Sequence, residues 1–386
     1  MPVLNRIAAY AEDMIEWRRW MHRHPELGFS CDKTAAYVAE RLRDFGVDEI
    51  HEGIARTGIV AVIEGEGPGP TIGLRADMDA LPMEEQSGVP YASETPGAMH
   101  ACGHDGHTTM LLGAARYLAE TRRFKGRVAL LFQPAEEQGG GARVMVEEGV
   151  LDRFDIAEVY ALHNAPESPL GEFHTAPGPV MAAVDEFAIT IRGEGGHAAW
   201  PHACVDPVPA ALRLATAFDT IVSRNADPID RLVVSVTQVH AGTAFNVIPG
   251  QARLGGTVRT FTPEMRDLAE RRMSEICAGL AAAFGVEIDI TYRRDYPATV
   301  NHGPEAMRAA DVAAEIVGEA KVDRALRPSM GAEDFAYMLE VRPGAYLTLG
   351  MGGGPICHHP AYDFRDEIAP LGASFFARLV ECRQPL

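Results

Sequence analysis

The sequence contains few cysteines for its length. Its 386 residues include six, and no two of them are spaced as a CxxC pair. A framework of disulfide bonds is therefore not expected, and the sparse cysteines favour a reducing, cytoplasmic location.

The chain also has no excess of positive charge. Lys and Arg number 35, whereas Asp and Glu number 54, so the net charge is −19. Phosphate groups and anionic lipid require a basic surface, so nucleic acid and membranes are not expected partners. A small-molecule or cationic ligand suits such a chain better.

Long hydrophobic runs are absent as well. No apolar stretch approaches the roughly 18 residues of a membrane span. The first residues, MPVLNRIAAYAEDMIEW, lack the basic start and apolar core of a secretory signal. The apolar and charged fractions, 47% and 23%, are those of ordinary globular proteins. At about 100–200 residues per domain, the length predicts two domains or three.

The first part of the chain alternates strands with helices. Residues 127–132 (RVALLF) form a nearly continuous apolar run, which is typical of a buried strand in a parallel or mixed sheet. Further strands are expected at 57–64, 71–76 and 159–163, and helices at 6–24, 34–45 and 107–120. This alternation predicts a layered α/β domain.

The pattern changes near residue 184. Strands are expected at 186–192, 231–240, 252–261 and 286–293, with helices at 206–224 and 263–284. Their order, β-α-β-β-α-β, is the split ferredoxin-like order. Thr262 and Pro263 fit the N-cap and first position of the second helix. We therefore expect residues 184–294 to be an inserted domain, and residues 1–183 and 295–386 to form the domain that it interrupts.

The densest group of reactive side chains is MHACGHDGH at residues 99–107. Thiolate, imidazole and carboxylate are ligands of zinc and related metals, and a cysteine near a metal loses its proton and can bridge two ions. The alternative is a His-rich loop that caps a helix, with Asp105 as the N-cap and Cys102 as a small buried residue.

A second group, FQPAEEQGGG at residues 132–141, follows the apolar strand directly. Open α/β sheets bind ligands at the carboxyl ends of their strands. One carboxylate of the pair Glu136 and Glu137 could bind metal while the other acts as a general base. The alternative is a solvated turn with two surface glutamates.

Three further segments carry weaker signals. His163 ends the strand VYALHN, where a lone histidine is more often structural than a ligand. His358 and His359 form a pair in CHHP after a Gly-rich loop. Asp77 and Asp79 in RADMDALP point to the same side of an extended chain. They could orient ligating histidines, or could cap the next segment.

The ordered motifs resemble one family along nearly the whole chain. They are LRADMDALPM, MHACGHDGHTTMLLGAA, FQPAEEQGGGARVMVEEG, ALHN, GGHAAWPH, FNVIPG, GTVRT, MGAEDFAYM and HHPAYDFRDE. The set is similar to the di-metal amidohydrolases of the aminoacylase/carboxypeptidase-G superfamily. Within it, the chain resembles the branch of hippurate hydrolases, N-acyl-L-amino-acid amidohydrolases and auxin-conjugate hydrolases.

The resemblance implies a metal-binding catalytic domain with an inserted lid that mediates homodimers or larger homo-oligomers. It implies two divalent ions per subunit, which could be Zn, Mn, Co or Ni. Cys102 would bridge the ions, and the other ligands would be His104, Glu137, His163 and His358.

The resemblance also implies roles for residues around the ions. Glu136 would be the general base, and Asp77 and Asp79 would support the ligands. His197 of the lid, from the same or the partner subunit, would stabilise the oxyanion. Asn246 and Arg259 would bind the substrate carboxylate.

The implied reaction is cleavage of an N-acyl amino acid, with a hippurate-like aromatic acyl group as the first expectation. Alternatives within the superfamily are deacetylation of an N-acetyl amino acid or N-acetyl-diaminopimelate, and hydrolysis of a dipeptide. A non-catalytic metal-binding protein is the alternative from another class. It would require a broken site, and all the expected ligand positions and the base are present.

Overall fold

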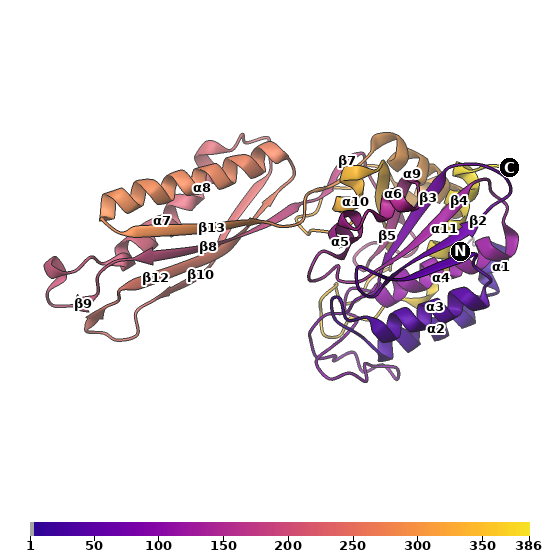
Figure 1. Ribbon diagram of the computed structural model, residues 1–386, viewed down its shortest axis with the longest axis horizontal. Coiled ribbons are helices and arrows are strands. Elements are labelled where there is room, and N and C mark those ends of the chain that lie inside the picture. The colour runs from indigo at the N-terminus through magenta and orange to yellow at the C-terminus, as the bar shows by residue number, and fades with distance from the viewer. Residues whose placement is uncertain (1–3) are drawn as a thin grey trace. The chain divides into compact units, whose positions relative to one another are not determined.

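The computed structural model describes residues 4–386 and divides them into two units (Figure 1). The second unit comprises Met181–Ala298 and Pro328–Glu333, and the rest of the described chain forms the first. The boundaries predicted from the sequence, 184 and 294, lie a few residues inside the longer of these two segments. The short return segment was not predicted, because it depends on a non-local bridge between Met181 and Ser329.

The first unit is built on an eight-stranded mixed sheet with the order β1-β2-β4-β3-β5-β16-β6-β15. Every residue of β3 is buried, as are the residues after Arg127 in β4, and this burial explains the continuous apolar run of β4. The strands are β1 (Glu49–Ile54), β2 (Gly58–Glu64), β3 (Thr71–Asp77), β4 (Arg127–Gln133), β5 (Ile156–Ala165), β16 (Gly344–Gly350), β6 (Phe173–His174) and β15 (Val322–Asp323).

Helices cover this sheet. α4 contacts strand β3 and packs between α11 and α2. The helices are α1 (Asn5–Ala8), α2 (Ala11–Arg23), α3 (Asp32–Asp44), α4 (His104–Thr121), α5 (Gly141–Glu147), α6 (Val150–Arg153), α9 (Gly303–Val317), α10 (Ala336–Val341) and α11 (Ala369–Arg383). The single helix expected over residues 6–24 is wrong, because the chain turns after Ala8 and a new helix begins at Ala11.

The parallel strands bring their carboxyl ends to one edge of the sheet. β3 runs parallel to β4 and β5, with Asp77 beside Gln133, and β5 runs parallel to β16, with His163 beside Thr348. The segments that follow these strands therefore leave the sheet together. They contain the acidic and histidine motifs predicted to carry chemistry.

The second unit has the predicted β-α-β-β-α-β order, which is confirmed. β8 (Ala183–Arg192), β10 (Leu232–Ala241), β12 (Gln251–Thr260) and β13 (Glu287–Arg294) form an antiparallel sheet in the order β10-β12-β8-β13. Helices α7 (Pro207–Thr220) and α8 (Pro263–Phe284) lie on one of its faces (Figure 1).

Local sequence explains this second unit well. Side chains of β8 alternate between buried and less buried positions, so one face packs against the helices. Asp206 caps α7 by accepting from the Val208 N–H, and Thr262 caps α8 by accepting from the Met265 N–H. Thr262 and Pro263 thus take the positions predicted for them.

Two further features are the state of the cysteines and the character of the helices. All six cysteines are free thiols. Among the described residues, no helix combines the length and the apolar character needed to cross a bilayer.

Gly106 in α4 provides a test of the packing between α4 and the segment before α11. A Cβ at this position would lie 2.2–2.5 Å from three ring carbons of Phe364, which is fully buried. Gly106→Ala should lower the free energy of unfolding by about 1–3 kcal/mol, because the ring cannot move without strain. Denaturant unfolding followed by circular dichroism measures this change.

Gly303→Ala is the matched control in the same unit. Its Cβ would make only an ordinary contact, 3.8 Å from the Pro177 Cβ. We expect a change below about 0.5 kcal/mol. Equal effects of the two substitutions would contradict the packing described for Gly106.

Candidate metal centre

Ligand-type atoms from four segments gather at the edge of the first sheet. In each of three groups of residues, the ligand-type atoms lie within 4.8 Å of one another. Each group contains two of the residues Cys102, His104 and Glu137. Because of this sharing, they form one continuous cluster. The groups are Cys102–His104–His163, Cys102–Glu137–His358 and His104–Glu136–Glu137.

The surroundings of His104 show that a cation fits this cluster. Its Nε2 atom is buried and has no hydrogen-bond partner. Carboxylate oxygens of Asp77, Glu136 and Glu137 lie 3.6, 3.9 and 3.9 Å from that nitrogen. Such separations are too long for hydrogen bonds, but two ligands of one tetrahedral ion lie about 3.4 Å apart. The donor set of sulfur, nitrogen and carboxylate oxygen suits a divalent transition metal.

Asp79 holds His104 and the two glutamates in place. The His104 Nδ1 atom lies 2.8 Å from the Asp79 carbonyl oxygen, which leaves Nε2 directed at the cluster. The Asp79 carboxylate accepts the backbone N–H groups of Glu136 and Glu137 at 2.9 and 3.1 Å. Burial raises the pKa of this carboxyl group. One side chain therefore organises three candidate site residues.

Asp77 lies at the centre of a second buried set of contacts. Its carboxylate oxygens lie 2.6 Å from His107 Nδ1 and 2.7 Å from Arg75 Nη1. Arg75 also donates to Asp334 at 2.8 Å. Burial would raise the pKa of Asp77, but the charges of His104, Arg75 and His107 hold it well below its usual range. Asp77 is therefore an anion that faces the His104 side of the cluster.

His163 and Cys102 meet on the other side of the cluster. Their Nε2 and Sγ atoms are 3.4 Å apart, and His163 Nδ1 lies 2.7 Å from the Asn164 carbonyl oxygen. Asn164 also contacts the second nitrogen of His107 at 2.7 Å through its side-chain oxygen. His163 thus presents a ring nitrogen to the Cys102 thiol.

His358 reaches the cluster from an exposed loop. Its side chain is 54% exposed, and its Nε2 atom lies 3.1 Å from a Glu137 oxygen. The backbone of His358 has a φ of 66°, which is uncommon for a residue other than glycine. Its neighbour His359 instead accepts the Ala361 N–H with Nδ1. The structure therefore brings His358, rather than His359, to Glu137.

Several residues around the cluster were not singled out from the sequence. Cys357 donates to the Cys102 carbonyl oxygen at 3.8 Å and accepts from Asn164 at 3.6 Å. Asn164 and Asp334 lie in motifs quoted above, ALHN and MGAEDFAYM, which was the available signal for them. Cys357 is the first residue of the quoted segment CHHP, in which only the two histidines were considered as ligands.

The other predicted site residues belong to the second unit. His197 on β9 (Gly196–His197) pairs with Val247 on β11 (Val247–Ile248), and the Ala198 N–H donates to the Asn246 carbonyl oxygen at 3.0 Å. His197 and Asn246 are therefore close neighbours. Arg259 lies on β12, where burial lowers the pKa of its guanidinium group, and donates to the Val258 carbonyl oxygen at 3.1 Å.

A buried charge network lies beneath the start of α4. Asp105 is buried, and one of its oxygens lies 2.8 Å from His22 Nδ1 and 3.7 Å from Arg18 Nη1. The other ring nitrogen of His22 lies 3.2 Å from Glu85. Burial opposes the charged form of His22, but the hydrogen bonds with Asp105 and Glu85 raise its pKa to about 9.

Comparison with known proteins agrees with this geometry. The family model "Peptidase family M20/M25/M40" matches residues 73–381. A hippurate hydrolase of Campylobacter jejuni is 42% identical over 94% of both chains, and an N-acetylcysteine deacetylase of Bacillus subtilis is 39% identical over 96% of this chain and 97% of its own. A solved dinuclear metal-binding peptidase of the M20 family from Bacillus subtilis superposes with a TM-score of 0.86. It is 36% identical, with coverage of 98% of this chain and 99% of that one.

His22 gives a pH-dependent test of the buried network. Its folded pKa of about 9 lies above the value of about 6.5 for an unfolded chain. Its contribution to stability should therefore be complete below about pH 6.5 and be lost as the pH rises through about 9. The shift corresponds to roughly 3 kcal/mol at most.

His22→Gln should lose this part of the pH dependence. Urea unfolding of the metal-free protein measures it at pH 6.5, 8 and 10 through tryptophan fluorescence, to which Trp17 and Trp20 on α2 contribute. Other groups titrate in both proteins, so the difference between them isolates His22. Parallel stability curves for the two proteins would show that His22 carries no charge in the fold.

Proposed function

The chain belongs to peptidase family M20/M25/M40, and on this premise we propose that it is a metal-dependent amidohydrolase of N-acyl amino acids. It would cleave the amide bond to release a carboxylic acid and a free amino acid. The observation that carries the proposal is the cluster around His104 Nε2, a buried nitrogen without a hydrogen-bond partner among carboxylates.

We assign the cluster to two divalent ions. Cys102, His104 and Glu137 each belong to two of the three ligand groups. Of these, Cys102 would lie between the ions, as the resemblance of the motifs implies. His104, Glu137, His163 and His358 would complete the set. When bound, such ions polarise a carbonyl oxygen and lower the pKa of a water molecule toward about 7. Zn, Mn, Co and Ni all suit these ligands.

Glu136 is the proposed general base. Its side chain is mostly buried beside His104, and Asp79 holds its backbone N–H. A Glu136 carboxylate oxygen would take a proton from the attacking water, whose oxygen forms the new bond to the acyl carbon. Glu136 would then deliver that proton to the amide nitrogen as the C–N bond breaks.

Residues of the second unit would act on the substrate. The Nδ1 atom of His197 accepts the Ala199 N–H at 3.1 Å, which leaves Nε2 to carry the ring proton. That N–H would stabilise the oxyanion, a contact whose loss typically lowers the rate by about 10²–10³. Asn246 and Arg259 would bind the substrate carboxylate.

Self-association through the second unit is part of the proposal. β10 is an outer strand of its sheet, and Val233 and Val239 on this strand are exposed. Exposed apolar side chains on an edge strand favour pairing with another chain. We propose a homodimer or larger homo-oligomer in the cytoplasm, which this edge and the free cysteines support.

Deacetylation is the second candidate function. Two N-acetylcysteine deacetylases of Bacillus subtilis are 39% and 41% identical to the chain, close to the 42% of the hippurate hydrolase. The catalytic groups would be the same, and only the acyl group would differ. The two candidates therefore share every residue assigned above and separate only by substrate.

A substrate panel tests the proposal and separates the two candidates. The metal-loaded enzyme is incubated with N-acetyl, N-benzoyl, N-indoleacetyl and long-chain acyl amino acids and with dipeptides, and kcat/KM is ranked. The highest value on a benzoyl substrate supports a hippurate-type enzyme, and the highest value on an acetyl substrate supports a deacetylase. No turnover of any acyl amino acid with added Mn²⁺, Co²⁺ or Zn²⁺ would reject both.

Glu136→Gln tests the assignment of the general base. The amide cannot take the proton, so kcat should fall by a factor of about 10² or more while the metal content stays that of the wild type. Single-turnover kinetics and elemental analysis measure the two quantities. Glu147→Gln, a change of an exposed side chain on α5, is the control and should leave kcat and the metal content unchanged. A Glu136→Gln enzyme that keeps more than a tenth of wild-type turnover would remove Glu136 from this role.

A further inference from the structure

The two segments that carry His104 and His358 are packed directly against each other. Gly103 has a φ of 92°, and a Cβ there would lie 2.1 Å from the Asn164 Oδ1 and 2.5 Å from the Tyr362 hydroxyl. Three residues further on, Gly106 leaves space for the ring of Phe364. The segment after His358 therefore rests on the first turn of α4, so the relative position of the two histidines depends on this contact.

Arg18 of α2 lies beneath both segments and touches each of them. Its Nη1 atom is 3.7 Å from Asp105, the residue after His104, and 3.1 Å from Asp363, five residues after His358. Its Nε atom donates to Asp366 at 2.7 Å. The Arg18 side chain is 1% exposed and that of Asp105 is fully buried, whereas Asp366 and Asp363 are 12% and 30% exposed.

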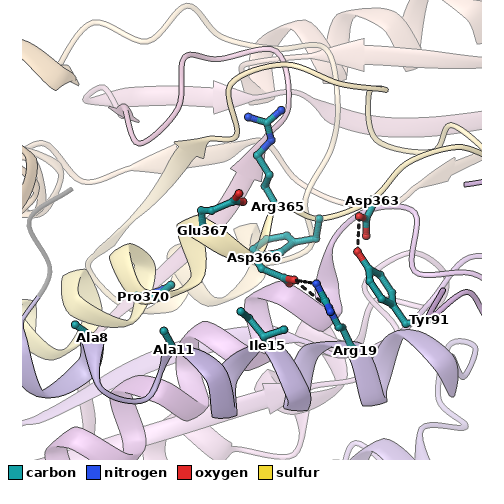
Figure 2. Close-up of a pocket in the computed structure, with 11 residues that line it drawn as sticks. Ala8, Ala11, Ile15, Arg19, Tyr91, Asp363, Arg365, Asp366, Glu367 and Pro370 are labelled. Atoms are coloured by element: carbon teal, nitrogen blue, oxygen red, sulfur yellow. Dashed lines mark hydrogen bonds and ion pairs between the residues drawn. The ribbon is translucent and has the colours of Figure 1, made fainter. Parts of the chain in front are cut away.

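Arg19 provides a contrast within the same helix. Arg19 also pairs with Asp366, at 2.9 Å. The guanidinium groups of both arginines lie over the Tyr91 ring, that of Arg19 at 4.3 Å and that of Arg18 at 4.5 Å. Figure 2 shows Arg19 beside Asp366, and the hydrogen bond from the Tyr91 hydroxyl to Asp363. These residues line a pocket of about 620 Å³. No contact joins Arg19 to Asp105, and its side chain is 39% exposed.

We propose that Arg18 is a positioning residue that fixes His358 relative to His104 and so sets the affinity of the metal centre. The inference rests on the proposed function, because it takes these two histidines as ligands. Arg18 itself touches neither ligand. It acts through Asp105 on the start of α4 and through Asp363 and Asp366 on the segment that carries His358.

The geometry of arginine suits this task. Its planar fork reaches carboxylates in different directions from fixed positions, whereas a lysine ammonium group is a single point charge. Asp105 does not need Arg18 for neutralisation, since His22 already contacts it at 2.8 Å. A buried ion pair contributes little to stability on average, but it can define one arrangement of the groups around it.

His358 is the ligand that most needs such support. Its side chain is half exposed and its backbone is in the left-handed region, where a residue other than glycine is strained. On its N-terminal side the segment is anchored by the His358 N–H, which donates to the Ala101 carbonyl oxygen at 2.7 Å. On its C-terminal side the segment is anchored by Tyr362, by Phe364 and by the carboxylates that pair with Arg18. Loss of the Arg18 contacts should therefore displace His358 before the other ligands.

The experiment compares Arg18→Met and Arg18→Lys with Arg19→Met as the matched control. Zn²⁺ affinity is measured by competition with a chromophoric chelator, and the visible and near-ultraviolet spectrum of the Co²⁺-loaded protein reports ligand geometry. Thermal unfolding of each metal-free variant shows whether it folds. Removal of groups that orient metal ligands typically weakens metal binding about 10–100-fold.

We expect Arg18→Met and Arg18→Lys to weaken Zn²⁺ binding by about 10–100-fold and to alter the Co²⁺ spectrum. Arg19→Met should bind Zn²⁺ within about twofold of the wild type, even though it also loses a contact with Asp366. If Arg18→Met does not fold, Asp363→Asn replaces it, because that side chain is 30% exposed and is better able to tolerate the change. Asp363→Asn should weaken binding in the same direction.

Unchanged Zn²⁺ affinity and an unchanged Co²⁺ spectrum in folded Arg18→Lys and Asp363→Asn would overturn the proposal, whatever their thermal stability. Equal losses in the Arg18 and Arg19 variants would also overturn it, since the effect would then belong to Asp366 alone. Failure of the proposed function is distinguishable. A wild-type protein that binds Zn²⁺ but hydrolyses no acyl amino acid contradicts the function and leaves the Arg18 test intact.

Discussion

The burial of negative charge at the edge of the first sheet is the constraint on which the site depends. Each buried carboxylate must be matched, because an unpaired ion out of water is very costly. Asp334 is matched by Arg75, Asp105 by Arg18 and His22, and Asp79 by backbone N–H groups. Around His104 Nε2 the carboxylates of Glu136 and Glu137 lie beyond hydrogen-bond distance. Cations bound in that region would compensate the remaining negative charge.

The parallel arrangement of the strands explains why the site lies at strand ends. β3, β4 and β5 are parallel, so the residues that follow them meet at one edge without long connections. β4 delivers the glutamate pair, β5 delivers His163, and α4 begins with His104. All the residues assigned to metal belong to the first unit, and those assigned to the substrate carboxylate and oxyanion belong to the second. In the proposed function, metal binding and the assigned substrate contacts would thus be carried by separate units.

Much of this was predictable from local patterns. Strand β4, which is buried after Arg127, was visible as RVALLF, and the β-α-β-β-α-β order was visible from the alternation and the caps of its helices. The motifs also contained every residue of the three ligand groups. What local patterns could not reveal were contacts between distant segments. Arg18 reads as one of several arginines on an amphipathic helix, and its partners Asp105, Asp363 and Asp366 are far away in sequence. The turn between α1 and α2, and the bridge from Met181 to Ser329, depend on tertiary packing in the same way.

The central claim is that one cluster containing a single bridging thiolate holds two ions. Anomalous X-ray diffraction from crystals of the zinc-loaded protein, recorded on both sides of the zinc absorption edge, tests it most directly. The account predicts two anomalous peaks per subunit, with the Cys102 sulfur between them and His104, Glu137, His163 and His358 around them. A single peak, or two peaks that do not share Cys102, would contradict it.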